Sequence, residues 1–373
     1  MDRRDPPLRF WRCRACGTPN PWRDYVRSCL GCGSERPVAP DPILPSVGPR
    51  RGRLIGAAAW GYAGAVAALL LVLRLGGDRF WAATLLLYAP RWPFALPLVV
   101  LVPTALIRRR RSLIPLALAS VLMIGPILGL CVPWRHLLRR EPAGSRLRVM
   151  TCNVQSGHWD PARLGAAVAE ADPDILLLQE WSEFPAAPPA WSAGRHVRRD
   201  GGLYVSSRYP FRSTEVLRDP VAPWRTIAAR YDVDAPSGPI RVFNVHLETP
   251  RKGIEPVLHG GVAGVEELNF NTASRDAESA RVARWVGEAR GRVLVGGDFN
   301  LPPDGVIFAR YWGRFTDAFA DSGWGLGYTK STRWHGLRID HVLSDYGRRG
   351  FNPCWVGPDV GSDHRPIVAE WAD

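Results

Sequence analysis

Several apolar runs in the second half of the chain end in side chains that suit phosphate and metal chemistry. These are Asn153 after RVMTC, Glu180 after DILLLQ, His246 in RVFNVHLE, Asp298 and Asn300 in VLVGGDFN, and Asp340 in LRIDHVLS. Near the C-terminus, GSDHRP places Asp363 beside His364. One such residue alone is usually a turn residue or a helix cap. Their recurrence at the ends of hydrophobic runs instead predicts a shared site at the edge of a sheet.

The types of these side chains limit what the site binds. Carboxylates and carboxamides are hard oxygen donors, which suit Mg²⁺, Mn²⁺ or Ca²⁺. Region 142–373 contains only Cys152 and Cys354, too few thiols for a soft-metal site. A hard cation among acids and histidines favours phosphate chemistry, in which the cation neutralises phosphate oxygens and a carboxylate activates water. In GGDFN, the glycines allow close backbone approach, and Asp298 and Asn300 share one face of an extended chain.

Region 142–373 alternates short β-branched runs with helical stretches. Residues 160–171 and 271–290 have the apolar periodicity of amphipathic helices. The Gly-rich passage 250–264 has the composition of a mobile, substrate-facing loop. Together these patterns predict an α/β layered domain. Its strands are expected at LRVMTCNV, DILLLQE, TIAARYDV, IRVFNVHLE, RVLVGGDFN, LRIDHVLS and PIVAEW.

The motifs TCN, QE, NVHLE, GGDFN, RIDHVLS and SDHRPI occur in this order within residues 146–373. As an ordered set they resemble the endonuclease/exonuclease/phosphatase superfamily, metal-dependent phosphoesterases similar to deoxyribonuclease I. The resemblance implies a four-layered α/β sandwich, in which two packed mixed sheets are flanked by helices. It also implies that the site lies at one edge of this sandwich.

The same resemblance implies roles for individual residues. Glu180 would be the principal metal ligand, with Asn153 and Asp363 beside it. Asp298 would orient or deprotonate the attacking water, and Asn300 would hold the phosphate or that water. His364 would bind the phosphate, with Asp340 fixing its tautomer and favouring its protonated form. His246 resembles the family's second histidine, a candidate acid for the leaving group.

Residues 1–35 contain a second cluster, with the spacing Cys13-x2-Cys16-x12-Cys29-x2-Cys32. Two CxxC pairs on tight turns suit a tetrahedral Zn²⁺ in a segment too short to bury a core. Two disulfides are the alternative. With Trp11 and Asn20, the cysteines resemble zinc fingers of the Ran-binding-protein type, whose members bind ubiquitin or single-stranded RNA. The gap from Asn20 to Cys29 is longer than usual, so a generic zinc ribbon is a second possibility.

Between the two clusters lie a Pro-rich, basic linker at 36–53 and a membrane region at 54–134. Segments 54–73 and 112–134 are uncharged and long enough to span a bilayer, and 80–107 is apolar except for Arg91. We expect three transmembrane helices, not the buried core helices of a soluble domain. Arginines at 50–53 and 108–111 then place the zinc module in the cytoplasm and residues after 135 outside, whereas Arg135, Arg139 and Arg140 oppose this orientation.

The net charge is distributed unevenly along the chain. Residues 1–141 carry a net charge of +14, whereas 142–373, the expected catalytic domain, carry −1. A surface that binds duplex DNA normally has a basic excess, so a phospholipid headgroup or a small phosphorylated compound is as good a candidate substrate as nucleic acid. The sequence predicts a membrane-anchored, divalent-metal-dependent phosphoesterase that hydrolyses a phosphodiester or a phosphomonoester. A nuclease is one enzyme of this kind. The alternative is a catalytically idle membrane scaffold whose zinc finger binds a protein or RNA partner.

Overall fold

The computed structural model describes residues 10–21, 27–35, 49–134, 146–181, 189–345 and 351–372. The chain divides into two compact units, Met1–Ala57 and Ala58–Asp373. Positions 36–48 of the expected linker, and the arginines at 135, 139 and 140, lie outside the described residues. Helix α1 (Pro49–Leu71) begins within the range expected for the linker.

The second unit contains two mixed six-stranded sheets, as the sequence predicts. The strands β3 and β4 are parallel, as are β9 and β10, and the other pairings in these sheets are antiparallel. The first sheet has the order β15 (Phe351–Val356), β16 (Ile367–Ala372), β3 (Arg146–Asn153), β4 (Ile175–Gln179), β6 (Leu203–Ser207) and β5 (His196–Asp200). The second has the order β11 (Thr316–Asp317), β14 (Asp340–Ser344), β10 (Arg292–Asp298), β9 (Gly238–His246), β8 (Thr226–Ala235) and β7 (Phe211–Arg218).

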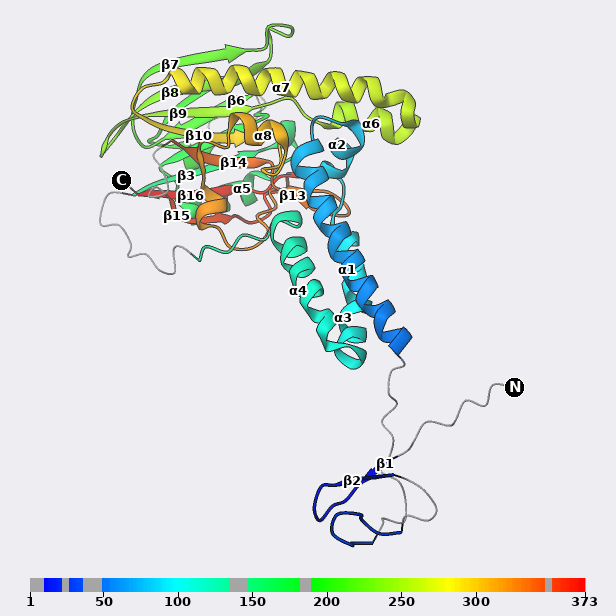
Figure 1. The fold of residues 1–373 in the computed structure, drawn as a ribbon. Helices are drawn as coiled ribbons and strands as arrows, with labels where there is room; N and C mark the ends of the chain where they lie inside the picture. The colour runs from blue at the N-terminus through cyan, green and yellow to red at the C-terminus, as the bar shows by residue number, and fades with distance from the viewer. Residues whose placement is uncertain are drawn as a thin grey trace. The chain divides into compact units, whose positions relative to one another are not determined.

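Three apolar clusters define the layers of this unit. Val149 and Leu294 belong to the cluster between the two sheets. Met150, next in sequence to Val149, points to the opposite face and packs with helix α5 (Pro161–Ala171), because successive strand residues alternate in direction. On the outer face of the second sheet, Val286 of α7 (Val265–Glu288) packs with Phe243 and with α8 (Val306–Tyr311) (Figure 1). The order of layers is therefore helix, sheet, sheet, helix.

The Gly-rich passage is not the loop that its composition indicates. It forms α6 (Arg251–Gly260) and a short 3₁₀ helix, Gly261–Gly264, and α7 starts directly afterwards, earlier than predicted. Gly264 packs so closely on the backbone of α6 that a Cβ there would lie 2.3 Å from the carbonyl carbon of Pro256. Glycine therefore serves tight helix–helix packing at this position, and the prediction of a mobile loop is wrong.

The apolar region forms α1, α2 (Trp81–Tyr88), α3 (Leu96–Arg108) and α4 (Leu113–Leu122). By length and composition, Arg53–Gly76 and Arg110–Ile127 can each span a membrane, and Trp81–Tyr88 with Trp92–Arg108, bent by 84°, can count as a third span. Ala59, Ala105 and Leu116 pack together where α1, α3 and α4 meet. Outside this contact, Ile107 is 81% and Ile114 71% exposed, so α3 and α4 present large apolar side chains on their outer surface.

Candidate functional site

The polar residues singled out in the sequence lie at one edge of the sheet pair. The parallel strands β3 and β4, and likewise β9 and β10, end at this edge, and the antiparallel β14 begins there. Asp298 is paired with His246 on one side and with Asp340 on the other. The segment between β15 and β16 adds Asp363 and His364. Contacts given below join the side chains of seven of the eight predicted catalytic and metal-binding residues into one network, and Asn300 joins it through its backbone N–H.

The two glycines before Asp298 are required by close packing. Gly297 has φ +148°, and a Cβ there would lie 2.0 Å from the carbonyl oxygen of Val245 on β9. A Cβ on Gly296 would lie 2.7 Å from a methyl group of Leu177 in the other sheet. Beyond the strand, Asn300 has φ +53°, in the left-handed region that non-glycine residues seldom adopt. The chain therefore turns sharply immediately after Asp298.

Asp298 is the centre of the network and is 1% exposed. The Asn153 amide Nδ2 donates to Asp298 Oδ2 and to Glu180 Oε1, at 2.9 Å each. The backbone N–H of Asn300 donates to Asp298 Oδ1 at 2.9 Å. Burial, together with the negative charge of Asp340, raises the pKa of Asp298 to about 7. A carboxylate with this pKa is suited to act as a general base near neutral pH.

His364 forms a buried pair with Asp340. Its Nδ1 lies 2.8 Å from Asp340 Oδ2, so Nε2 faces Asp298 Oδ2 at 3.7 Å and Asp363 Oδ1 at 3.8 Å. Burial disfavours the imidazolium, but the charges of Asp340 and Asp298 outweigh it and raise the pKa of His364 to about 9. His364 is therefore protonated at neutral pH, and its Nε2–H can donate to an anion.

His246 is held between two carboxylates, with its Nε2 3.6 Å from Glu180 Oε1 and 4.0 Å from Asp298 Oδ2. Burial lowers the pKa of His246 to about 4, despite the opposing charge of Glu180. The imidazole is therefore neutral at neutral pH. This does not suit the role expected from the sequence, in which an imidazolium gives its proton to the leaving group.

The carboxylates at the outer side of the network fit a hard divalent cation. Glu180 is partly exposed and receives hydrogen bonds from Asn153 and, at 2.9 Å, from Ser156 Oγ. Asp363 Oδ1 is buried without a hydrogen-bond partner among the described residues. This oxygen and Asp298 Oδ2 both face His364 Nε2, at 3.8 and 3.7 Å, and burial together with the charge of Asp340 raises the pKa of Asp298. The place therefore favours positive charge. Glu180 and Asp363 offer carboxylate oxygens there, whereas Asn153 directs its Nδ2 to Glu180 and Asp298, and its Oδ1 accepts from the Gln155 N–H at 2.9 Å.

The sequence analysis did not assign Lys330 to the site. Lys330 forms an ion pair with Asp363, which it reaches from the hairpin of β12 (Lys330–Ser331) and β13 (Gly336–Leu337). The only sequence signal is its rarity, since Lys252 and Lys330 are the two lysines among 48 basic residues. The sequence analysis also missed Ser156, which lies three residues after Asn153. In the structure its backbone has φ +49°.

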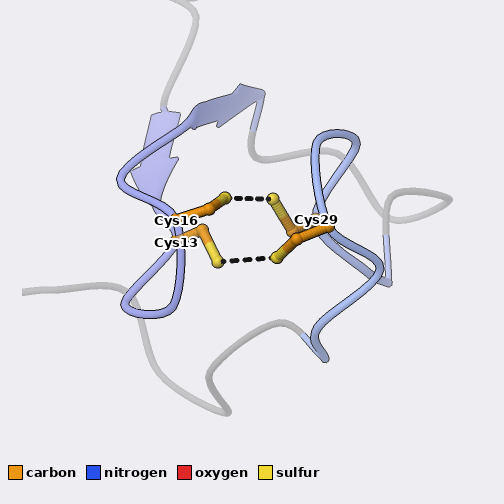
Figure 2. A group of neighbouring side chains, drawn as sticks. Cys13, Cys16 and Cys29 are labelled. Atoms are coloured by element: carbon orange, nitrogen blue, oxygen red, sulfur yellow. Dashed lines mark hydrogen bonds between the residues drawn. The ribbon is translucent and has the colours of Figure 1, made fainter.

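The four N-terminal cysteines form a separate cluster in the first unit (Figure 2). Cys13 and Cys16 lie on the turn that joins β1 (Phe10–Arg12) to β2 (Pro19–Pro21), and Cys29 and Cys32 lie on a second turn after β2. Cys13 Sγ is 3.6 Å from Cys32 Sγ, Cys16 Sγ is 3.5 Å from Cys29 Sγ, and all four sulfurs lie within 4.8 Å of one another. All seven cysteines of the chain are free thiols, including Cys152 and Cys354.

Asn20 supports this cluster from the β2 strand. Its Oδ1 accepts from the Leu30 N–H at 2.7 Å, and its Nδ2 lies 3.4 Å from Cys29 Sγ. Burial raises the pKa of Cys29, but hydrogen bonds from the Gly31 amide and from Asn20 outweigh it and lower the pKa to about 6. Because the thiolate is the metal-binding form, the arrangement is suited to a tetrahedral thiolate site.

The chain is similar in sequence to one protein family and in fold to several solved structures. The model of the Endonuclease/Exonuclease/phosphatase family matches residues 150–364, more than half of the chain. A 3′-5′ exonuclease from Neisseria meningitidis is 21% identical, with a TM-score of 0.49 over 61% of this chain and 100% of the exonuclease. An AP endonuclease from Archaeoglobus fulgidus is 18% identical, with a TM-score of 0.46 over 60% and 98%. Truncated TDP2 from Caenorhabditis elegans is 19% identical, with a TM-score of 0.45 over 61% and 98%. No curated protein matches the chain.

Proposed function

The chain belongs to the endonuclease/exonuclease/phosphatase family, and from this premise we propose that it is a membrane-anchored, divalent-metal-dependent phosphoesterase. The observation that supports this most is the convergence of Asn153, Glu180, Asp298 and the Asp340–His364 pair at one edge of the sheets. The scaffold alternative is disfavoured, since every motif side chain is present and makes contacts within the network.

The reaction we propose is hydrolysis by in-line attack of water on phosphorus. A divalent cation held by Glu180, Asp363 and Asn153 would neutralise charge on the phosphate. Asp298 accepts a proton from the attacking water, while the Asn153 and Asn300 hydrogen bonds hold its carboxylate in place. The His364 imidazolium donates from Nε2 to a phosphate oxygen and stabilises the charge that develops there. Asp340 keeps that imidazolium protonated and oriented.

A cavity lies next to the network. It has a volume of about 660 Å³ and its lining includes Glu248, Phe270 and Glu278. Arg225 connects it to the site, since its guanidinium contacts Glu278 and Glu248 and donates to the His246 carbonyl oxygen. Five acidic residues line the cavity, Asp219, Glu248, Glu266, Glu267 and Glu278, together with the basic residues Lys252 and Arg281. Because Arg225 also pairs with three of these acids, the charge of the lining does not choose between nucleic acid and the other substrate classes.

The proposal is tested with the purified full-length chain in detergent and Mg²⁺. Three kinds of substrate are compared: single- and double-stranded DNA, phospholipids and lysophospholipids, and small phosphorylated compounds such as inositol phosphates. We expect turnover of at least one phosphoester and its loss on chelation of the metal. If none of the three classes is hydrolysed, the enzyme proposal fails.

Glu180→Ala is expected to raise the Mg²⁺ concentration needed for half-maximal activity by roughly 100-fold or more, because it removes a charged oxygen donor from the proposed cation site. The measurement is a Mg²⁺ titration of activity. Glu170→Ala, an exposed position on α5, is the matched control and should retain the wild-type titration. An unchanged midpoint in Glu180→Ala would remove Glu180 from the metal site.

Activity is expected to fall as pH rises through about 9, because His364 then loses the proton that it donates to the phosphate. Below that pH the imidazolium is fully present, so the loss caused by His364 is confined to the alkaline side, whereas protonation of Asp298 gives a separate acidic limb near pH 7. Asp340→Asn removes the negative charge that raises the pKa of His364 and should move the alkaline limb to lower pH. The measurement is the pH dependence of kcat/KM for both proteins. Coincident alkaline limbs would contradict the role of the pair.

The proposed membrane orientation follows from the α3–α4 hairpin. Arg108–Arg111 lie at its turn, whereas the opposite ends contact the catalytic unit: Trp92 donates to the Trp334 carbonyl oxygen, and Tyr328 donates to the Leu128 carbonyl oxygen. Arginine clusters stay on the cytoplasmic side, so the catalytic domain is proposed to lie outside. A reporter fused after residue 140 that is active only in the cytoplasm would overturn this orientation.

The cysteine cluster is proposed to hold one Zn²⁺ in the cytoplasm. Cys29→Ser is expected to lose this ion and to unfold the module, since metal binding takes the place of a core. Zinc content per chain, measured by elemental analysis after gel filtration, reports the outcome. Cys131→Ser, which removes a free thiol outside the cluster, is the control and should keep its zinc. Equal zinc content in the two variants would exclude this site.

A further inference from the structure

Arg275, on α7, is fully buried in the catalytic unit. The sequence favours an exposed helix arginine at this position, but its side chain is 1% exposed. Its NH1 donates to Asp78 Oδ1 at 3.0 Å and to the Tyr88 hydroxyl oxygen at 2.7 Å. Asp78 precedes α2 and Tyr88 ends it, so the partners of Arg275 come from the apolar region of the chain, almost two hundred residues away.

Tyr88 connects this buried pair to the active site. Its hydroxyl group accepts from Arg275 and donates to the carbonyl oxygen of Asn300 at 3.1 Å. Asn300 is the residue whose backbone N–H holds Asp298 and whose side chain donates to the Leu247 carbonyl oxygen at 2.9 Å. The hydrogen bond from Tyr88 therefore fixes the peptide that follows Asn300. A rotation there would disturb the contact between Asn300 and the Asp298 carboxylate.

The same segment fastens the loop after Asn300 at two more points. Arg91 NH1 contacts Asp304 Oδ2 at 2.6 Å, and both side chains are largely buried. A Cβ on Gly305 would lie 2.7 Å from Asp78 Oδ2, so the loop packs closely against this buried carboxylate. Residues 78–91 thus contact the loop at its start and at its end.

The hairpin that carries Lys330 rests on the same segment. His335 Nε2 lies 2.8 Å from the Tyr88 carbonyl oxygen, and Trp92 Nε1 donates to the Trp334 carbonyl oxygen at 3.2 Å. Both residues lie between β12 and β13, whose Lys330 pairs with Asp363. Residues 78–92 therefore support two separate sides of the active site.

A segment that only tethers a domain to a membrane needs no such contacts. A buried ion pair usually adds little stability compared with apolar packing, so its presence here indicates a requirement for defined geometry. We propose that residues 78–92 are a structural part of the active site, in which Tyr88, held by Arg275 and Asp78, is a positioning residue for Asn300 and Asp298. This inference rests on the proposed phosphoesterase function.

The test is Tyr88→Phe in the full-length protein, which removes only the hydroxyl group. We expect a roughly tenfold lower kcat, the size of effect that one lost hydrogen bond can have, with unchanged KM and an unchanged Mg²⁺ midpoint. The matched control is Tyr62→Phe, because Tyr62 donates to the Phe94 carbonyl oxygen within the helical region. It should keep the wild-type kcat. A merely structural role for Tyr88 would lower the melting temperature or the active fraction, measured by active-site titration, without changing kcat per active site.

Two results overturn the inference. One is a wild-type kcat in folded Tyr88→Phe, and the other is an equal loss in Tyr62→Phe. If Tyr88→Phe cannot be purified folded, Asp304→Asn carries the test: a several-fold lower kcat at unchanged KM supports the inference, and a wild-type kcat contradicts it. Failure of the proposed function looks different, because the wild-type protein itself would then hydrolyse no phosphoester.

Discussion

Asp298→Asn is expected to lower kcat by about 10² to 10⁴-fold, because it removes the group that accepts the proton of the attacking water. Asparagine has nearly the same shape, and its single oxygen can keep either the Asn153 or the Asn300 hydrogen bond. Loss of the other should cost about 1–3 kcal/mol of stability, so circular dichroism and a melting curve are needed to show that the fold is preserved. The measurement is kcat for the best substrate at saturating Mg²⁺, with circular dichroism as the check on folding.

Asp359→Asn is the matched control for this change. Asp359 is an exposed aspartate that pairs with Arg163 at the surface, and its neutralisation should leave kcat unchanged. Asp298→Asn with a kcat within a few-fold of the wild-type value would show that Asp298 is not the base. Glu180 would then be the next carboxylate to examine, since it shares the Asn153 amide with Asp298.

The largest expected loss of stability comes from Asp78→Ala. It leaves the Arg275 guanidinium buried without its carboxylate partner, a change that typically costs about 3–5 kcal/mol of the free energy of unfolding. Denaturant unfolding of the detergent-solubilised protein measures it. Asp276→Ala changes an aspartate of α7, whose half-exposed side chain pairs with Arg310 of α8 and accepts from the Tyr311 hydroxyl group; it should cost about 1 kcal/mol.

A double variant separates lost charge from lost packing at this position. Asp78→Ala combined with Arg275→Met removes both charges, and we expect it to recover part of the stability lost in Asp78→Ala. Two results would contradict a costly buried charge at Arg275. One is a double variant with a lower free energy of unfolding than Asp78→Ala, and the other is an equal loss of stability in Asp78→Ala and Asp276→Ala.

Much of the site could be predicted because its residues follow strands. Asn153, Glu180 and Asp298 each end a run that is recognisable by its apolar residues, and neighbouring parallel strands bring their ends to the same edge. The structure places these residues together, and their roles stay predictions. The sequence around His246 did not indicate its protonation state, since its low pKa depends on burial in the assembled site.

The support of the site could not be predicted from local patterns. Arg275 lies in a helix among other polar residues, and only the tertiary structure shows that it meets Asp78 and Tyr88. Arg91 is the one charged residue of the otherwise apolar segment 80–107, and only the tertiary structure shows that it pairs with Asp304. Helix α6 and the first residues of α7 were not predicted, because the glycines of this passage suggested a flexible loop. In the structure Gly264 allows the two helices to pack closely.

The 84° bend between Trp81–Tyr88 and Trp92–Arg108 has a practical consequence. Because the bend turns α2 against α7, a soluble version made by deleting everything before residue 142 would lack the partner of a buried arginine and expose the surface that α2 covers. A useful water-soluble enzyme would have to retain residues 78–92, grafted back through a designed connection, while the apolar helices α1, α3 and α4 are discarded.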